Sequence, residues 1–241
     1  MTDKTHREVK QPEISVRYLA DYMAASERKR RTIIEGCKYR PIARLHQHKE
    51  APIAIAHALR HGTATPEGLK ERAGMIRAKI ATDDFDAFTN ETNADYVEAF
   101  SKVVAGLELP EAEILPGNSF PDFDIRGTKV TFAPNLMLRR LIKKTNKVRR
   151  GALMLRYAKG SPLSPTVGGY QSAAAFGLLG MVKDEETGEP DKTLCLTLCA
   201  LAGKPYAAPT NSVSIFHNMR AACETIAERW PNIKPPKGAI L

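Results

Sequence analysis

Seven cationic side chains lie within twelve residues in the second half of the chain. Cations this close together repel one another unless anions neutralise them. A nucleic-acid backbone supplies such anions, and each phosphate contact also releases counterions. We therefore predict that these side chains donate hydrogen bonds to phosphate oxygens. They form what we call the basic cluster: Arg139, Arg140, Lys143, Lys144, Lys147, Arg149 and Arg150.

Carboxylates are missing around the basic cluster. Residues 126–181 include eleven Lys and Arg but no Asp or Glu, whereas residues 81–125 include eleven acids and one Lys. The whole chain has a net charge of +9. Two alternatives to nucleic acid are a solvated basic loop and pairing between the cluster and the acidic segment 81–125. We favour nucleic acid, because basic patches are its usual electrostatic signature.

A second basic set, Arg28, Lys29, Arg30 and Arg31, opens a predicted helix in the first half of the chain. We expect these side chains to contact phosphates as well. Few aromatic residues interleave with the basic cluster, so base stacking is not expected to dominate there. Contact with the phosphates, largely independent of base sequence, fits better. We expect DNA rather than RNA as the partner.

The histidines do not predict a metal site. His57 and His61 are four residues apart, which places two imidazoles on one face of a helix. However, Arg60 lies beside them and the His-Glu-x-x-His pattern is absent. We expect a basic surface here and neither a metal nor another cofactor.

Helix signals dominate the first part of the chain. Ser15, Ser26 and Thr65 each precede an amphipathic run and are candidate N-caps. A further helix is predicted over 94–104. We therefore expect a helical N-terminal region over residues 1–110.

Strand signals appear in the second part of the chain. Turn residues separate short apolar runs there, and two longer helical patterns follow. The fold class predicted is α+β (mixed α/β), with a mixed-sheet domain and flanking helices over residues 111–241. The predicted elements are a hairpin of 122–125 with 129–132, strands 136–142 and 152–157, a helix 167–182, a strand 194–201 and a helix 212–230.

From residue 94 to residue 200 the predicted order is helix, strand, strand, strand, helix, strand. This order resembles the core of the PD-(D/E)XK nuclease-like fold. Pro121-Asp122 begins a predicted strand, as the first acid of that family does, and Lys159 follows the end of another, as the family's lysine does. The resemblance covers less than half of the chain. It implies a scaffold adapted to duplex or branched nucleic acid.

The chain departs from the family at one essential position. Members that cut DNA need a second carboxylate two residues before the lysine, so that two acids together hold Mg²⁺. That position is Tyr157 here, and Asp124 is the nearby substitute. We therefore expect the chemistry to be lost. The alternative is a nuclease that depends on Mg²⁺ and uses Asp122, Asp124 and Lys159.

The leading prediction is a non-catalytic nucleic-acid-binding protein. A third hypothesis is a structural subunit whose basic and acidic segments dock other protein chains, for example in an anti-phage or mobile-element system. The composition, 43% hydrophobic and 26% charged, is that of a globular protein. No secretory signal and no apolar run of about 20 residues is present. We expect a cytoplasmic protein without a membrane partner.

Overall fold

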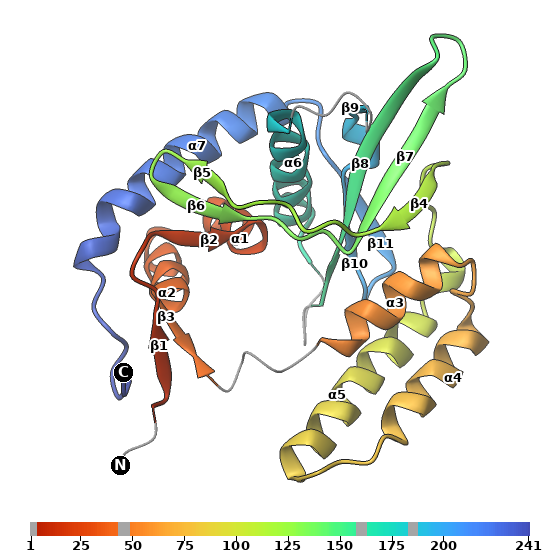
Figure 1. Cartoon of the computed structure of the whole chain (residues 1–241), viewed down its shortest axis with the longest axis horizontal. Helices are drawn as coiled ribbons and strands as arrows, with labels where there is room; N and C mark the ends of the chain where they lie inside the picture. The colour runs from red at the N-terminus through yellow and green to blue at the C-terminus, as the bar shows by residue number, and fades with distance from the viewer. Residues whose placement is uncertain (1–3, 43–48, 158–162, 183–187) are drawn as a thin grey trace.

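The structure is a computed structural model that describes residues 4–42, 49–157, 163–182 and 188–241. Helices and a mixed sheet are combined in it, which confirms the predicted α+β class (Figure 1). The helices are α1 (Val16–Ala24), α2 (Glu27–Lys38), α3 (Glu50–Arg60), α4 (Pro66–Arg77), α5 (Asp84–Ser101), α6 (Pro165–Met181) and α7 (Ser212–Arg229). The strands are β1 (His6–Glu8), β2 (Glu13–Ser15), β3 (Tyr39–Pro41), β4 (Glu113–Pro116), β5 (Phe123–Ile125), β6 (Thr128–Thr131), β7 (Leu136–Ile142), β8 (Lys147–Arg156), β9 (Glu189–Pro190), β10 (Leu196–Cys199) and β11 (Lys204–Ala207).

The central sheet has the strand order β11-β10-β8-β7-β4, and the short β9 pairs with β8. β8 and β10 are parallel, whereas β4, β7 and β8 follow one another as antiparallel neighbours. Side chains alternate between the two faces along each strand. Leu153 belongs to the hydrophobic cluster that contains residues of α3, α4 and α5, and Met154 belongs to the cluster that contains residues of α6 and α7. Both faces are therefore covered by helices, as the apolar run 194–201 predicts.

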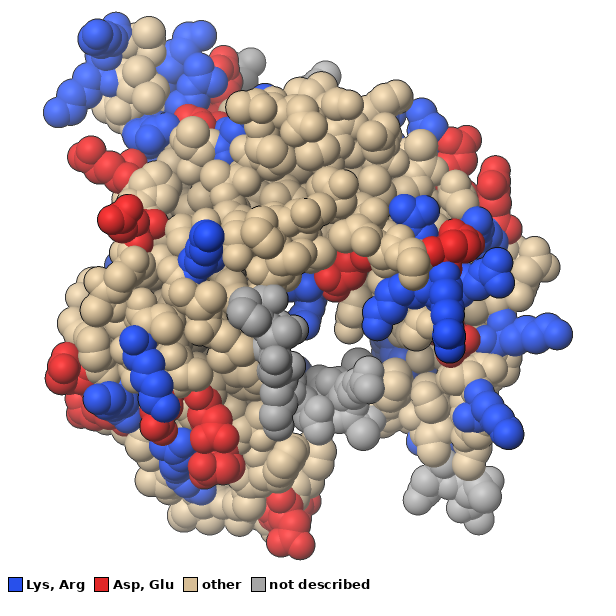
Figure 2. All heavy atoms as spheres, turned by 180° about the vertical axis from the view of Figure 1, so that it is seen from behind, with Lys and Arg blue, Asp and Glu red and all other residues tan. Residues whose placement is uncertain are grey.

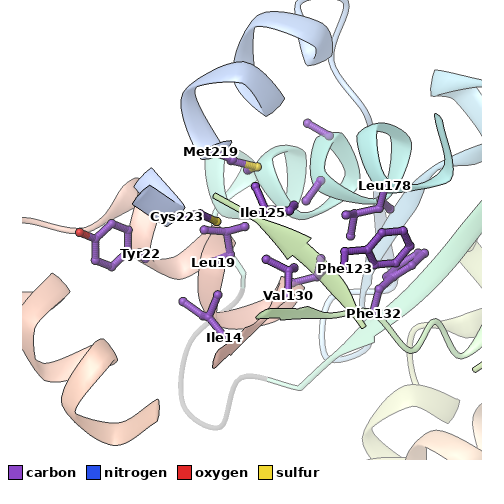
Figure 3. Close-up of a cluster of buried hydrophobic side chains, with 14 of the residues drawn as sticks. Ile14, Leu19, Tyr22, Phe123, Ile125, Val130, Phe132, Leu178, Met219 and Cys223 are labelled. Atoms are coloured by element: carbon purple, nitrogen blue, oxygen red, sulfur yellow. The ribbon is translucent and has the colours of Figure 1, made fainter. Parts of the chain in front are cut away.

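A second sheet, of order β2-β6-β5, joins a strand near the N-terminus to a hairpin from the middle of the sequence. Arg126 and Gly127 form its hairpin turn with φ of 51° and 80°, the paired positive values of a tight type I′ turn. Figure 3 shows Phe123 and Val130 of this sheet gathered with Met219 of α7. This sheet therefore packs against α7 and is separate from the central sheet.

Both hydrophobic clusters take residues from either side of the expected boundary at residue 110. Ile14 and Leu19 share one cluster with Met219, and Val97 shares the other with Leu153. β2 also pairs directly with β6. Neither core therefore belongs to one side of that boundary.

Several helix ends follow from their capping residues. Ser15 and Thr65 accept hydrogen bonds from Tyr18 N and Gly68 N, as predicted. α5 begins ten residues before the predicted position, because Asp83 accepts a hydrogen bond from Asp86 N at 2.8 Å and caps it. Acids at the N-terminus of a helix also interact favourably with its dipole.

The four cysteines are free and buried, as their apolar surroundings predict. Burial raises the pKa of Cys37, Cys195 and Cys223 to about 12. Because the thiolate is the reactive form of cysteine, these three thiols are unreactive at neutral pH. Over the described part of the chain, no helix combines the length and the apolar character that a membrane span needs.

Candidate nucleic-acid interface

The basic cluster lies on a projecting hairpin. We call residues 139–150, the outer part of β7 and β8 with their connecting loop, the arm. Its strands pair from Arg139↔Arg150 to Ile142↔Lys147, and Asn146 in the loop has a φ of 51°. The arm extends past the central sheet at the upper right of Figure 1. Residues close in sequence thus become a narrow projection that a partner can approach from several sides.

The register of the arm places like charges opposite each other. Arg139 faces Arg150, and Arg140 faces Arg149. Opposed like charges destabilise a strand pair. Carboxylates on neighbouring segments offset this repulsion.

Two glutamates pair with exposed cations of the arm. Glu113, on β4, accepts from Arg139 Nη2 at 2.7 Å. Glu189, on β9, pairs with Arg149 and, at 3.7 Å, with Lys147 Nζ. Glu113 is the one acid of segment 81–125 that contacts the basic cluster among the described residues. The acids of α5 instead surround Arg77, which pairs with Glu91, Asp95 and Glu98.

Arg140 belongs to a small network at the base of the arm. Its Nη2 lies 2.8 Å from Asp191 Oδ2, and it also donates to Thr193 Oγ1 at 3.0 Å. Burial alone would raise the pKa of Asp191, but hydrogen bonds from Thr193 and Arg140 hold that pKa below its usual value. Asp191 is therefore ionised at neutral pH and neutralises Arg140.

Arg150 was expected to contact phosphate, and its position contradicts this. The residue is only 5% exposed. Its Nη2 donates to Leu179 O at 3.0 Å and to Val182 O at 2.7 Å, at the C-terminal end of α6. A cation at that end of a helix satisfies carbonyl groups that lack helical partners. Arg150 thus fastens α6 to the sheet and is removed from the predicted interface.

The loop of the arm carries the exposed charge. Lys143 and Lys144 are both exposed, and within the described residues no carboxylate pairs with either. Figure 2 shows Lys and Arg side chains on the surface of the projection at the upper left, which is the arm seen from behind. Among the described residues, three carboxylates pair with the seven cations of the basic cluster, so their summed charge remains positive.

The second basic set lies apart from the arm. α2 is on the opposite side of the molecule in Figure 1. Arg30 donates from Nε to Tyr22 O at 3.0 Å and stacks over the Tyr22 ring, so it closes the end of α1. Arg31 pairs with Glu27 at 3.6 Å, while Arg28 and Lys29 are exposed. The two predicted sets therefore do not form one continuous surface.

The residues of the nuclease alternative have structural partners. Asp122 Oδ2 lies 2.7 Å from Lys129 Nζ, and this hydrogen bond raises the pKa of Lys129. Asp124 Oδ1 accepts from Gly127 N at 3.1 Å within the hairpin turn. Both acids border the β2-β6-β5 sheet rather than β8. Lys159 lies outside the described residues.

Carboxylate, thiolate and imidazole groups are not gathered for a metal in the described ranges. No cluster of three or more such residues occurs there. The rings of His57 and His61 lie 4.3 Å apart on α3, without a third possible ligand among the described residues.

The neutralising acids Glu113, Glu189 and Asp191 were not anticipated from the sequence. Glu113 and Glu189 lie on short edge strands that no periodicity marks. The available signal for Glu113 was the alternative of pairing with the acidic segment 81–125, whereas Glu189 and Asp191 lie in the acid-containing segment that follows the acid-free stretch. A scan against models of protein families matches none to this chain, and a search of curated proteins finds no relative.

Proposed function

We propose that this chain binds nucleic acid through the arm and carries out no chemistry on it. The observation that carries the proposal is the pair Lys143 and Lys144, exposed at the end of a projecting hairpin without a described carboxylate partner. Phosphates would neutralise these lysines and release counterions. The two lysines, with Lys147 beside them, are the primary contacts.

The ion pairs of the arm do not oppose this function. Glu113 and Arg139 are both about half exposed, as are Glu189 and Lys147. Exposed ion pairs typically contribute about 0–1 kcal/mol. A phosphate can therefore exchange with Glu113 or Glu189 at little free-energy cost, and Arg139 and Arg149 become additional contacts.

The shape of the arm favours duplex DNA. The major groove of B-DNA is about 12 Å wide and admits a two-stranded β-ribbon. The major groove of double-stranded RNA is deep and too narrow for side chains to reach the bases. Because the arm carries cations on both of its faces, it can contact the phosphates on either side of a groove.

The resemblance to the nuclease-like core rests on element order, and the chain has that order only when β5 and β6 of the second sheet and the two-residue β9 are left out. α5, β4, β7, β8, α6 and β10 follow in the order helix, strand, strand, strand, helix, strand, with β4 in place of the predicted hairpin. Asn135 lies just before the start of β7, beside the end of β8, and its Oδ1 accepts a hydrogen bond from Leu155 N at 2.7 Å. The neighbouring Leu153 is buried and apolar. Neither Asn135 nor Leu153 supplies a carboxylate at this position, which favours a binding role over catalysis.

Fluorescence anisotropy with duplex DNA, single-stranded DNA and duplex RNA tests the proposal, over a salt series with and without Mg²⁺. We expect affinity to fall steeply with salt for every probe and to be highest for duplex DNA. Lys143→Glu/Lys144→Glu should weaken binding at least about 10-fold and reduce the salt slope by about two. All probes should remain uncut in Mg²⁺.

Lys234→Glu/Lys237→Glu is the matched control, because both lysines are exposed and lie in the C-terminal tail. It changes the net charge by the same amount and should leave most of the affinity. Equal loss in the two variants would mean that overall charge, rather than the arm, governs binding. An unchanged affinity in the arm variant would disprove the proposal.

A further inference from the structure

Apolar side chains are exposed at the far end of the α4–α5 helical pair. We call residues 78–88, the connection between these helices with the first turn of α5, the α4–α5 tip. Ile80 is 96% exposed, Phe88 56% and Phe85 40%. Phe85 and Phe88 are three residues apart on a helix and so lie on the same side of it. Grouped exposed apolar residues mark interaction sites more often than scattered ones do.

The α4–α5 tip is also acidic. Asp83, Asp84 and Asp86 lie among the apolar residues, and none of them forms an ion pair with a described residue. The carboxylates of Asp83 and Asp86 already accept local hydrogen bonds, from Asp86 N and from Thr82 respectively. Asp84 is exposed and has no such local role. A complementary surface must therefore present cations beside an apolar side chain.

The arm is such a surface. Leu141 is 53% exposed and lies next to the exposed Lys143 and Lys144. The arm and the α4–α5 tip lie at opposite ends of the molecule, at the top and the bottom of Figure 1. A single copy therefore cannot bring its own arm to its own tip. Two copies can do so by stacking head to tail.

We propose that the arm of one copy docks on the α4–α5 tip of a second copy. Leu141 would contact Phe85, Phe88 and Ile80, while the lysines would face Asp84 and its neighbours. Such a contact is heterologous, so it leaves one free arm and one free tip and continues as an open chain. Nucleic acid and a second copy would compete for the same lysines, so that binding of nucleic acid would release the assembly.

Sedimentation velocity on protein freed of nucleic acid tests this proposal. For the native chain, the mean mass at low salt should rise with protein concentration and fall back toward the monomer as salt is added. A mass that stays at the monomer over the whole concentration range would overturn the proposal, and would mean that a different partner covers the tip. Association that disappears on nuclease treatment would also overturn it.

Two double variants test whether the contact joins the arm of one copy to the α4–α5 tip of another. Lys143→Glu/Lys144→Glu removes a competent arm and keeps the tip, whereas Ile80→Ser/Asp84→Asn removes the tip, keeps the arm and introduces no cation that the reversed arm could attract. Each alone should be monomeric. An equimolar mixture should form one-to-one dimers and nothing larger, because only one complementary pair of surfaces remains. Self-association of either variant alone, or a monomeric mixture, would contradict head-to-tail docking.

Controls separate this proposal from nucleic-acid binding. The substituted side chains are exposed, so circular dichroism and thermal unfolding should match those of the native chain. The tip variant should keep its affinity for DNA, measured below the concentrations at which the native chain associates. Leu141→Ser should weaken self-association more than it weakens DNA binding, because phosphates make no use of an apolar contact.

Discussion

Strand β8 runs from the end of the arm into the centre of the molecule, and its cations have opposite surroundings at its two ends. The Lys147 side chain is 59% exposed and faces Glu189 at 3.7 Å. The Arg156 side chain is 8% exposed, lies 2.7 Å from Asp21 Oδ1 and also donates to Arg17 O. Both belong to the same acid-free stretch of sequence.

The difference shows that local charge density does not reveal what a cation does. Arg156 neutralises a carboxylate supplied by α1, more than a hundred residues away in the sequence. Lys143 and Lys144 have no such partner among the described residues, and in Figure 1 their hairpin extends past the rest of the central sheet. The position of the strand relative to the rest of the fold therefore separates structural cations from available ones.

Replacement of the inner cation should have the largest effect. Arg156→Ala leaves Asp21 without its counter-charge in a partly buried site, and breaking a buried ion pair costs about 3–5 kcal/mol. We expect the low end of this range, because the Asp21 side chain is 28% exposed. Denaturant unfolding measures the loss. Lys144→Ala, on the arm, should change stability by less than about 0.5 kcal/mol. Similar losses of stability in both variants would show that the buried and the exposed cation do not differ in their structural role.

The base of the arm should be nearly as sensitive. A Cβ atom on Gly151 would lie 2.1 Å from Leu194 O, so Gly151→Ala must displace backbone and should cost about 1–3 kcal/mol. Gly36 is the matched control: it lies within α2 and has open space around its Cβ position. Gly36→Ala should stabilise the chain by about 0.5–1 kcal/mol. Thermal unfolding distinguishes the opposite signs.

Several long elements could be predicted from the sequence because their signals are local, although α5 begins ten residues and β8 five residues before the predicted position. Strand 136–142 and the helix from residue 212 follow from periodicity, and Ser15 and Thr65 cap the helices that they were expected to cap. The pairing of β2 with β6 could not be predicted, since a three-residue strand has no detectable period. The separate β5–β6 sheet was missed for a similar reason: a hairpin pattern does not say which sheet the hairpin joins.

Glu189→Gln should strengthen nucleic-acid binding modestly. The substitution removes the carboxylate that pairs with Arg149 and Lys147 and leaves both cations available. An exposed pair contributes about 0.2–1 kcal/mol, so we expect affinity to rise by up to about 5-fold, with a steeper salt dependence. Anisotropy titrations at two salt concentrations provide the measurement. Weaker binding would show that Glu189 positions the arm rather than competing with phosphate.

Charge reversal on α2 should have the smallest effect. Arg28→Glu/Lys29→Glu changes the net charge as much as the arm variant does, but these side chains lie on the opposite side of the molecule. At physiological salt the Debye length is about 8 Å, so we expect affinity to change by less than about 2-fold. The same anisotropy titration tests this. A loss of affinity as large as that of the arm variant would indicate that α2 belongs to the nucleic-acid interface.

The cations of the candidate site were visible in the sequence, but their partners were not. The sequence places Arg150 among seven equivalent cations, and only the packing of α6 against β8 reveals that it is buried. Likewise, Asp191 reaches Arg140 through a loop that follows β9, at a separation of 51 residues. Such contacts depend on tertiary structure, which charge patterns along a chain do not encode.

The burial of all four cysteines makes the arm accessible to selective labelling. Because the native thiols are shielded from solvent, a thiol introduced by Thr145→Cys in the exposed loop would react far faster with a maleimide dye. Such a dye would report directly on whether the loop becomes immobilised when DNA or a second copy is added. No native cysteine would have to be removed first.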